Sequence, residues 1–266
     1  MDAIFSAFLA TSHESMTRTL LLRGMWVGFV AGLFVFAFAR WIGEPHVDRS
    51  IAFETSLDQA KGEAPEPEMV SRKIQKSFGL LTGAIVYSSA LGGIFGLVFA
   101  YGRGRLSLAR PRVFAALLAA IGFTTIVLVP SLKYPANPPS VGNPDTIGVR
   151  TGAYFLLIAI SLTSMILTVK AGRRLSKSLG TWNASILSAL LFLSLVGVAS
   201  HFLPPIDEVP AGFPASLLWK FRIASWETQA LLWSLLGLLF GWFTERSEGS
   251  TGSHQTSNST KEMRYS

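Results

Sequence analysis

Cysteine is absent from this chain of 266 residues, and charged residues make up only 15% of it. Without cysteine the chain cannot form disulfides, a thiol nucleophile, an iron–sulfur cluster or a cysteine-ligated zinc site. A soluble domain carries about 25% charged residues, so the low charge argues against a soluble protein. Catalytic patterns are also missing, because no GxxxxGK[ST], GxSxG, HExxH or dinucleotide-binding motif occurs. We therefore expect a protein that is not an enzyme.

Apolar residues dominate what is present: they make up 50% of the chain, with a mean hydropathy of +0.42. A helix needs about 20 predominantly apolar residues to cross a hydrocarbon core of ~30 Å, and every backbone polar group must be satisfied within it. Six segments meet this requirement: residues 20–42, 78–101, 113–132, 151–169, 183–203 and 223–243. The sequence predicts an all-α, polytopic membrane helix bundle with one transmembrane domain over 1–243 and a disordered cytoplasmic tail over 244–266.

Lysine and arginine are unevenly distributed along the chain, whose net charge is +7. The segments expected on one side of six spans hold 13 of them: Arg18, Arg23, Arg103, Arg105, Arg110, Arg112, Lys170, Arg173, Arg174, Lys177, Arg246, Lys261 and Arg264. The short loops on the other side hold Lys133, Arg150, Lys220 and Arg222, although Arg72, Lys73 and Lys76 also precede the second span there. The positive-inside rule predicts that both termini are cytoplasmic. We expect a protein of the inner membrane. Because the basic residues flank apolar runs, we expect no nucleic-acid partner.

The loops expected outside are rich in proline and hold most of the candidate metal ligands. These candidates are Glu44, His46, Asp48, Asp145, His201 and Glu208. Imidazole and carboxylate groups together suit a divalent metal such as cobalt or nickel. An extended Glu44-x-His46-x-Asp48 would point all three side chains the same way. The alternatives are structural or solvated histidines at the interface and, for Asp145, a turn or helix N-cap role.

Small and polar residues inside the spans predict two further features. Glycines recur at a spacing of four, as in Gly24, Gly28 and Gly32, which allows two helix backbones to approach closely. Hydroxyl side chains could line a polar path or bond back to their own helix; they include Thr124, Thr125, Ser161 and Ser164. An acidic stretch at residues 63–68 would raise the local concentration of cations.

Four stretches resemble the probable cobalt transporter subunit family of CbtA type, over roughly residues 18–243. They are GEPHVDRSIAFE (43–54), VSRKIQKSFGLLTGAIVY (70–87), LKYPANPPSVGNPDTIG (132–148) and EVPAGFPASLLWKFRIAS (208–225). The resemblance implies an integral membrane component of cobalt uptake that serves cobalamin supply. It also implies a small single-span, histidine-rich partner subunit. Positions that match the shared pattern of the family include Glu44, Asp48, Lys133, Tyr134, Pro135, Asn137, Pro138, Asp145, Glu208, Arg222 and Gln229.

We therefore expect the membrane subunit of a Co²⁺ uptake transporter, embedded in the lipid bilayer, with Co²⁺ as substrate and no permanently bound cofactor. Two kinds of alternative remain open at this point. The protein could carry another divalent metal such as nickel, or a small solute. It could instead be a membrane scaffold or sensor that transports nothing.

Overall fold

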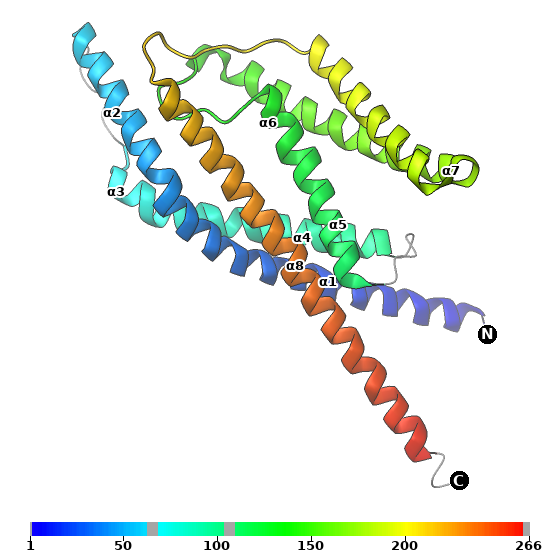
Figure 1. Cartoon of the computed structure of the whole chain (residues 1–266). Helices are drawn as coiled ribbons and strands as arrows, with labels where there is room; N and C mark the ends of the chain where they lie inside the picture. The colour runs from blue at the N-terminus through cyan, green and yellow to red at the C-terminus, as the bar shows by residue number, and fades with distance from the viewer. Residues whose placement is uncertain (1, 63–68, 104–109, 263–266) are drawn as a thin grey trace. The chain divides into compact units, whose positions relative to one another are not determined.

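The computed structural model describes residues 2–62, 69–103 and 110–262, and side chains only between Met16 and Glu248. Within these residues all regular structure is helical, which confirms the all-α prediction. In chain order (Figure 1) the elements are α1 (Asp2–Phe38), η1 (Ala39–Gly43), α2 (Glu44–Lys61), α3 (Arg72–Ile74), η2 (Gln75–Gly79), α4 (Leu80–Arg103), α5 (Pro111–Gly122), η3 (Phe123–Leu128), α6 (Val129–Lys133), η4 (Pro144–Thr146), α7 (Ile147–Phe202) and α8 (Ala215–Glu262).

Five helical stretches in the described part are long and apolar enough to cross a membrane: Met16–Lys61, Arg72–Arg103, Pro111–Lys133, Pro144–Phe202 and Ala215–Glu248. The predicted count of six is not confirmed, because two predicted spans, 151–169 and 183–203, both fall within α7. Gly180 interrupts α7 with a left-handed backbone conformation (φ 75°, ψ 162°). There α7 turns back on itself (Figure 1) and forms two arms. The number of crossings depends on whether each arm spans the membrane separately.

The segment after the first span is helical, which corrects the prediction of a loop at this place. Helix continues through η1 into α2 and ends only at Lys61. Pro45 does not stop it, because Gly43 keeps the right-handed helical conformation and the π-helical turn η1 leads directly into the proline. Gly62, in the left-handed conformation (φ 75°), ends α2. The acidic stretch at 63–68 lies outside the described residues.

Residues 244–262 are helical, as the end of α8. The remainder of the predicted tail, 263–266, lies outside the described residues. Disorder of this tail and a single transmembrane domain over 1–243 both stay predictions.

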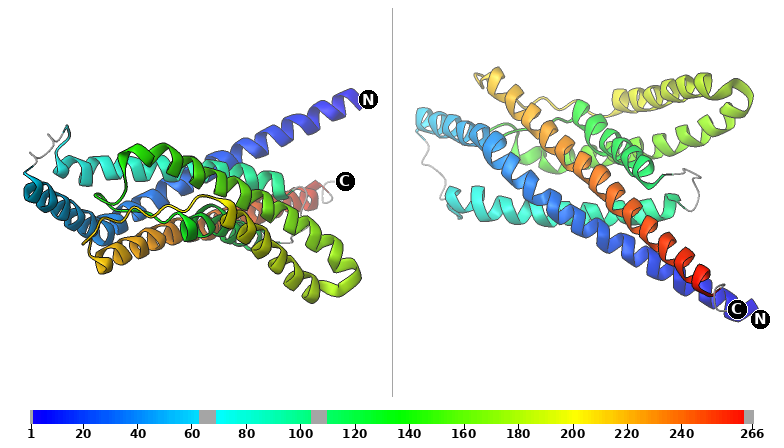
Figure 2. Two further views of the ribbon diagram at one scale, coloured as in Figure 1. Left: turned by 90° about the horizontal axis from the view of Figure 1, so that it is seen from above. Right: turned by 60° about the horizontal axis from the view of Figure 1, so that its bottom comes forward.

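The chain divides into two compact units, and the first contains residues 1–40, 68–121 and 230–266. In this unit α1 and α4 lie side by side (Figures 1 and 2). Glycines make this approach possible: a Cβ at Gly28 would collide with the Ser88 carbonyl oxygen, and one at Gly24 with that of Gly92. The close packing predicted from the glycine spacing is confirmed. In the core of this unit α8 also packs against α4. The Phe240 ring of α8 lies edge-on to the rings of Phe95 and Phe99.

The second unit contains residues 41–67 and 122–229. Its main core joins α6 and the residue after it, Tyr134, to both arms of α7. The buried members of this core are Val129, Tyr134, Ala153, Leu157 and Phe192. The arms also meet at Gly172, where a Cβ would lie 2.5 Å from the Ser188 hydroxyl oxygen. Antiparallel packing of the two arms therefore positions the loops at the ends of α7.

Candidate functional site

Residues 134–146 and 203–214, which we call the loop cap, form an ordered structure at the ends of α6, α7 and α8. Side-chain hydrogen bonds hold its proline-rich part: Tyr134 Oη donates to the Pro204 carbonyl oxygen (2.9 Å), Arg222 Nη2 to Asn137 Oδ1 (3.0 Å) and Ser50 Oγ to the Pro139 carbonyl oxygen (2.5 Å). Burial raises the pKa of Tyr134, so its hydroxyl stays a neutral donor. A small apolar cluster of Val141, Phe213 and Leu217 packs beneath these bonds. The prolines thus belong to a fixed structure and not to a loose loop.

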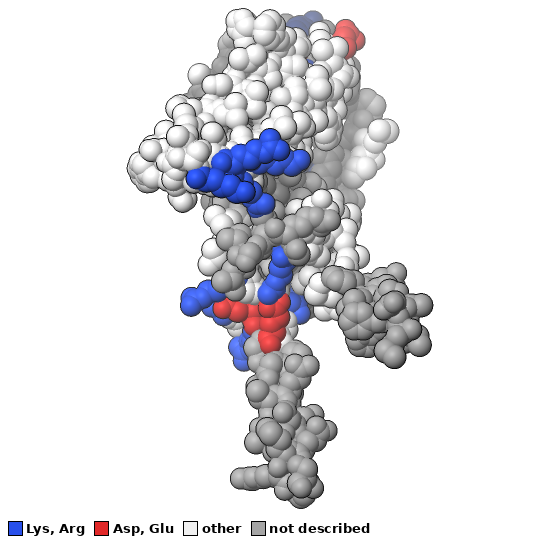
Figure 3. All heavy atoms as spheres, turned by 90° about the vertical axis from the view of Figure 1, so that its right-hand side faces the viewer, with Lys and Arg blue, Asp and Glu red and all other residues white. Residues whose placement is uncertain are grey.

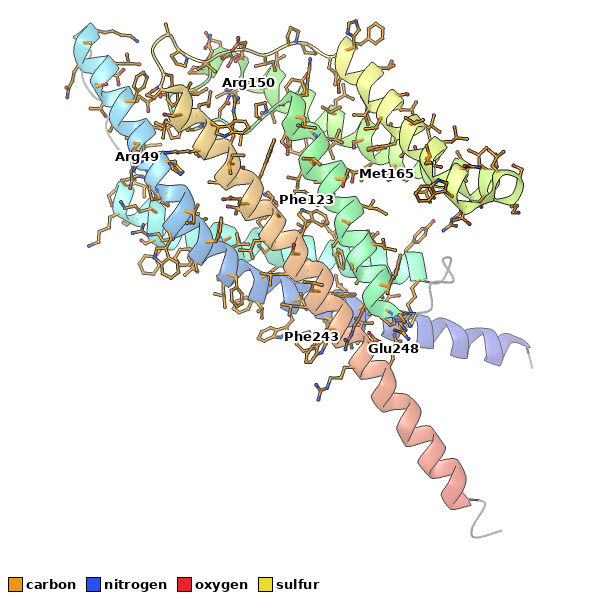
Figure 4. All side chains as sticks on the ribbon, viewed as in Figure 1. Arg49, Phe123, Arg150, Met165, Phe243 and Glu248 are labelled. Carbon is orange, nitrogen blue, oxygen red and sulfur yellow. The ribbon has the colours of Figure 1, made fainter. Side chains whose placement is uncertain are left out.

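Glu208 joins the two halves of the loop cap. Its Oε1 accepts a hydrogen bond from Thr146 Oγ1 (2.5 Å), and its Oε2 accepts one from the Asn143 backbone N–H (2.8 Å). Arg150 Nε lies 3.4 Å from the same Oε2 (Figure 4). The Thr146 hydroxyl, followed by the Asn143 N–H, lowers the pKa of Glu208, with a further contribution from the charge of Arg150. Both oxygens are engaged, so in this structure Glu208 serves as a clamp.

Gly142 and Asn143 fix the conformation of the turn before Asp145. Gly142 has φ 129°, and a Cβ there would collide with the Arg150 guanidinium. Asn143 then caps η4, because its Oδ1 accepts a hydrogen bond from the Asp145 N–H (3.0 Å). Asp145 itself lies within η4, and the N-cap position of α7 is Thr146, so the N-cap role considered for Asp145 is wrong. The Asp145 side chain is exposed within the first turn after Asn143.

The Glu44-x-His46-x-Asp48 motif lies in α2, so the extended alignment expected for it is wrong. At about 100° per residue, Glu44 and Asp48 share one side of the helix and His46 points away from both. Glu44 is buried, whereas His46 and Asp48 are half-buried. The charged groups acting on the His46 imidazole are Arg49 (Figure 4) and Lys220, both cations that would weaken the binding of a divalent metal there.

The structure does not gather the six candidate ligands into one site. His201, at the end of α7, is exposed and makes an edge contact with the Phe202 ring, with 5.4 Å between ring centroids. Among the residues whose side chains are described, no three His, Cys, Asp or Glu form a group able to hold a metal ion. That these six residues contact a metal stays a prediction.

A line of buried hydroxyl groups runs along the first arm of α7. Ser161, Ser164 and Thr168 follow one another at helical spacing on one face, and all three are buried. The hydroxyl oxygens of Ser161 and Thr168 have no hydrogen-bond partner in the described part of the chain. The arm packs against η3, a π-helix that contains the fully buried Thr125. π-Helical segments are frequent at functional sites, so this face is a candidate polar path.

The sequence analysis identified Thr125, Ser161 and Ser164 as candidates for a polar path, but it missed Thr168. Its distance of seven residues from Ser161, two helical turns, is the signal that could have found it. The π-helix of η3 left no comparable signal, because it depends on how the backbone packs against α7.

Basic segments meet at one end of the first unit. Arg103, at the end of α4, forms a two-pronged ion pair with Glu248 of α8 (Figure 4), one N–O distance being 2.6 Å. Arg112 Nε, at the start of α5, lies 2.6 Å from Glu245 Oε2 of α8. Figure 3 shows Lys and Arg side chains in patches, the lower of them beside Asp and Glu side chains, on a face that is otherwise mostly uncharged. These pairs bring together segments expected on one side of the membrane; which side that is stays a prediction.

Comparison with known families finds a match that covers most of the chain. A family model described as "Probable cobalt transporter subunit (CbtA)" matches residues 17–245. No curated protein and no solved structure matches the chain. The matched residues include the loop cap and the hydroxyl face of α7.

Proposed function

Because the chain belongs to the family of probable cobalt transporter subunits, we propose that it is the membrane subunit of a Co²⁺ uptake transporter that serves cobalamin supply. The observation that carries the proposal is the family match itself, which extends over residues 17–245. In this proposal the protein lies in the inner membrane with both termini cytoplasmic. The loop cap faces outward and is the place where Co²⁺ first meets the protein.

The ion contacts the outer carboxylates and imidazoles in turn and not at one preformed site. A permeating ion must bind well enough to enter and weakly enough to leave, so scattered ligands suit transport. In this role Glu44, His46, Asp48, Asp145 and His201 offer successive contacts. Glu208 contributes by holding the loop cap, because its oxygens already accept hydrogen bonds.

The hydroxyl face of α7 is the proposed route onward. Ser161 and Thr168 carry buried oxygens without a hydrogen-bond partner in the described part, and these can replace water around a cation. The membrane potential would drive the ion inward, at ~2.3 kcal/mol per charge per 100 mV, or about 4.6 kcal/mol for a dication. A small single-span, histidine-rich partner subunit would supply further imidazole ligands.

Uptake of radioactive cobalt into proteoliposomes tests the proposal, with the partner subunit both present and omitted. We expect uptake by the wild-type chain and a reduction of about tenfold in His46→Ala/His201→Ala. The matched control is His13→Ala/His254→Ala, which removes the other two histidines of the chain and should transport normally.

Each other result has a distinct meaning. Equal uptake by both double variants would show that the imidazoles of His46 and His201 are not part of the route, although the protein transports cobalt. Stronger uptake of nickel than of cobalt would identify another metal as the substrate. No uptake of any metal, even with the partner subunit, would contradict the transport function and favour a scaffold or sensor.

A further inference from the structure

A hollow of about 480 Å³ lies between α1 and α8 in the first unit and opens to the outside. The residues that line it are Arg23, Trp26, Phe243, Arg246 and Ser247. Among the residues whose side chains are described, the lining combines two guanidinium groups with two large aromatic rings and includes no carboxylate. Trp26 is 61% exposed and Phe243 40% exposed, so protein leaves much of both rings uncovered.

The charges of Arg23 and Arg246 are not neutralised by the nearby carboxylates, because these carboxylates form ion pairs with other arginines. Glu248 binds Arg103 through both oxygens, and Glu245 pairs with Arg112. Glu248 also acts electrostatically on Arg23, but its charge is shared between the two guanidinium groups. Arg246 is exposed and lies over the Trp242 ring, with its Cζ 5.3 Å from the ring centroid. An anion in the hollow would meet two cations at close range.

The position of these groups along the helices matches the depth of a lipid headgroup. Arg23 lies near the beginning of the apolar segment 20–42, and Arg246 lies just after the end of 223–243. Trp26 and Phe243 are each three residues further into the apolar segments. Aromatic side chains are enriched at this level of membrane proteins, where one end of the side chain meets water and the other meets the acyl chains. The hollow thus presents cations to a headgroup and rings to the acyl chains below it.

We propose that this hollow binds an anionic phospholipid, with its phosphate on Arg23 and Arg246 and an acyl chain along Trp26 and Phe243. Guanidinium groups bind phosphate oxygens in a two-pronged geometry, which a lysine cannot reproduce. Basic hollows between helices near the membrane surface are suited to anionic headgroups. The binding site is independent of the cobalt proposal, since none of its residues belongs to the route described above.

Native mass spectrometry of the purified full chain tests this site, with phosphatidylglycerol or phosphatidylcholine of identical acyl chains. We expect retention of phosphatidylglycerol about tenfold above phosphatidylcholine, and loss of this preference in Arg23→Gln/Arg246→Gln. Arg173→Gln/Arg174→Gln is the matched control: it removes two exposed arginines of α7, causes the same change in charge, and should keep the preference. Circular dichroism verifies that each variant is folded.

Three results would overturn the site. Equal retention of both lipids by the wild type would show that headgroup charge is not recognised. Equal losses in the two double variants would show a diffuse effect of net charge. Displacement of phosphatidylglycerol by millimolar inorganic phosphate would identify a site for soluble anions. If the double variant does not fold, Arg246→Gln alone decides, since this side chain is exposed; unchanged lipid preference in it would also contradict the proposal.

Discussion

Glu208 shows what one side chain does once its neighbours are in place. Its carboxylate accepts hydrogen bonds from residues 62 and 65 positions earlier in the chain, Thr146 and Asn143. As an isolated acidic residue in a proline-rich loop, Glu208 suggests a metal ligand. In the structure its hydrogen bonds instead hold the two halves of the loop cap together. At the residue scale, composition indicates which groups are available, and the fold decides which of them are already engaged.

The clamp predicts a pH dependence of stability. The pKa of Glu208 in the folded protein is lowered from its ordinary value of 4.5, chiefly by the Thr146 hydroxyl. The stabilisation is therefore complete above pH 4.5 and is lost as the pH falls through the lowered pKa. Glu208→Gln should reduce the melting temperature in detergent at pH 7 and make no difference at a pH below that lowered pKa. An equal reduction at both pH values would contradict the electrostatic clamp.

The elements show where local rules hold and where they fail. Gly24, Gly28 and Gly32 allow α1 to meet α4 closely, as their spacing predicts. The rule that proline ends a helix fails at Pro45, because the preceding π-helix carries the chain directly into α2. Helix ends depend on capping and on the register of the turn before them. For this reason the boundaries of the spans were less predictable than their existence.

The α1–α4 contact predicts unequal effects of two similar substitutions. Gly28→Ala places a Cβ against the Ser88 backbone and should lower the free energy of unfolding by about 1–3 kcal/mol. Gly83→Ala, in α4, meets nothing within 4 Å and should leave stability unchanged or raise it slightly. Unfolding in mixed detergent micelles measures the difference. Equal stability of the two variants would show that the helices tolerate separation at this point.

At the scale of the whole molecule, the organisation follows from which segments meet within each compact unit. In one unit the loop cap brings together segments expected outside the membrane, through bonds such as Asn143 to Glu208. In the other, Arg103 and Arg112 bring together segments expected inside. In each unit, the segments that meet are those that the distribution of Lys and Arg along the chain predicts on the same side of the membrane. The side of the membrane that each faces is open to a direct test.

Single cysteines in this cysteine-free chain test the topology. We expect a membrane-impermeant maleimide to label Asp145→Cys and Pro205→Cys in intact cells, and Ser178→Cys only after the cells are permeabilised. This pattern would place the two ends of α7 outside and its turn inside, so that both arms cross and the chain has six spans. Labelling of Ser178→Cys in intact cells together with the other two would contradict the six-span count. Reversed labelling would contradict an outward loop cap.

The sequence by itself determined the class of the protein. Apolar runs, the glycine spacing and the uneven distribution of arginine are properties of neighbouring residues, and lipid imposes helices on such runs wherever they lie. The motif at 132–148 also pointed to the family that the comparison then matched over 17–245. None of these inferences required knowing which distant residues touch.

Only the tertiary structure decided what the candidate groups do. It placed Glu44, His46 and Asp48 on a helix, engaged Glu208 in a clamp, and formed the hollow between Arg23 and Arg246. The last two of these results depend on contacts between residues far apart in the chain, where spacing carries no information. The free energy of a buried or paired charge is set by its neighbours in space, so its role becomes clear only after folding.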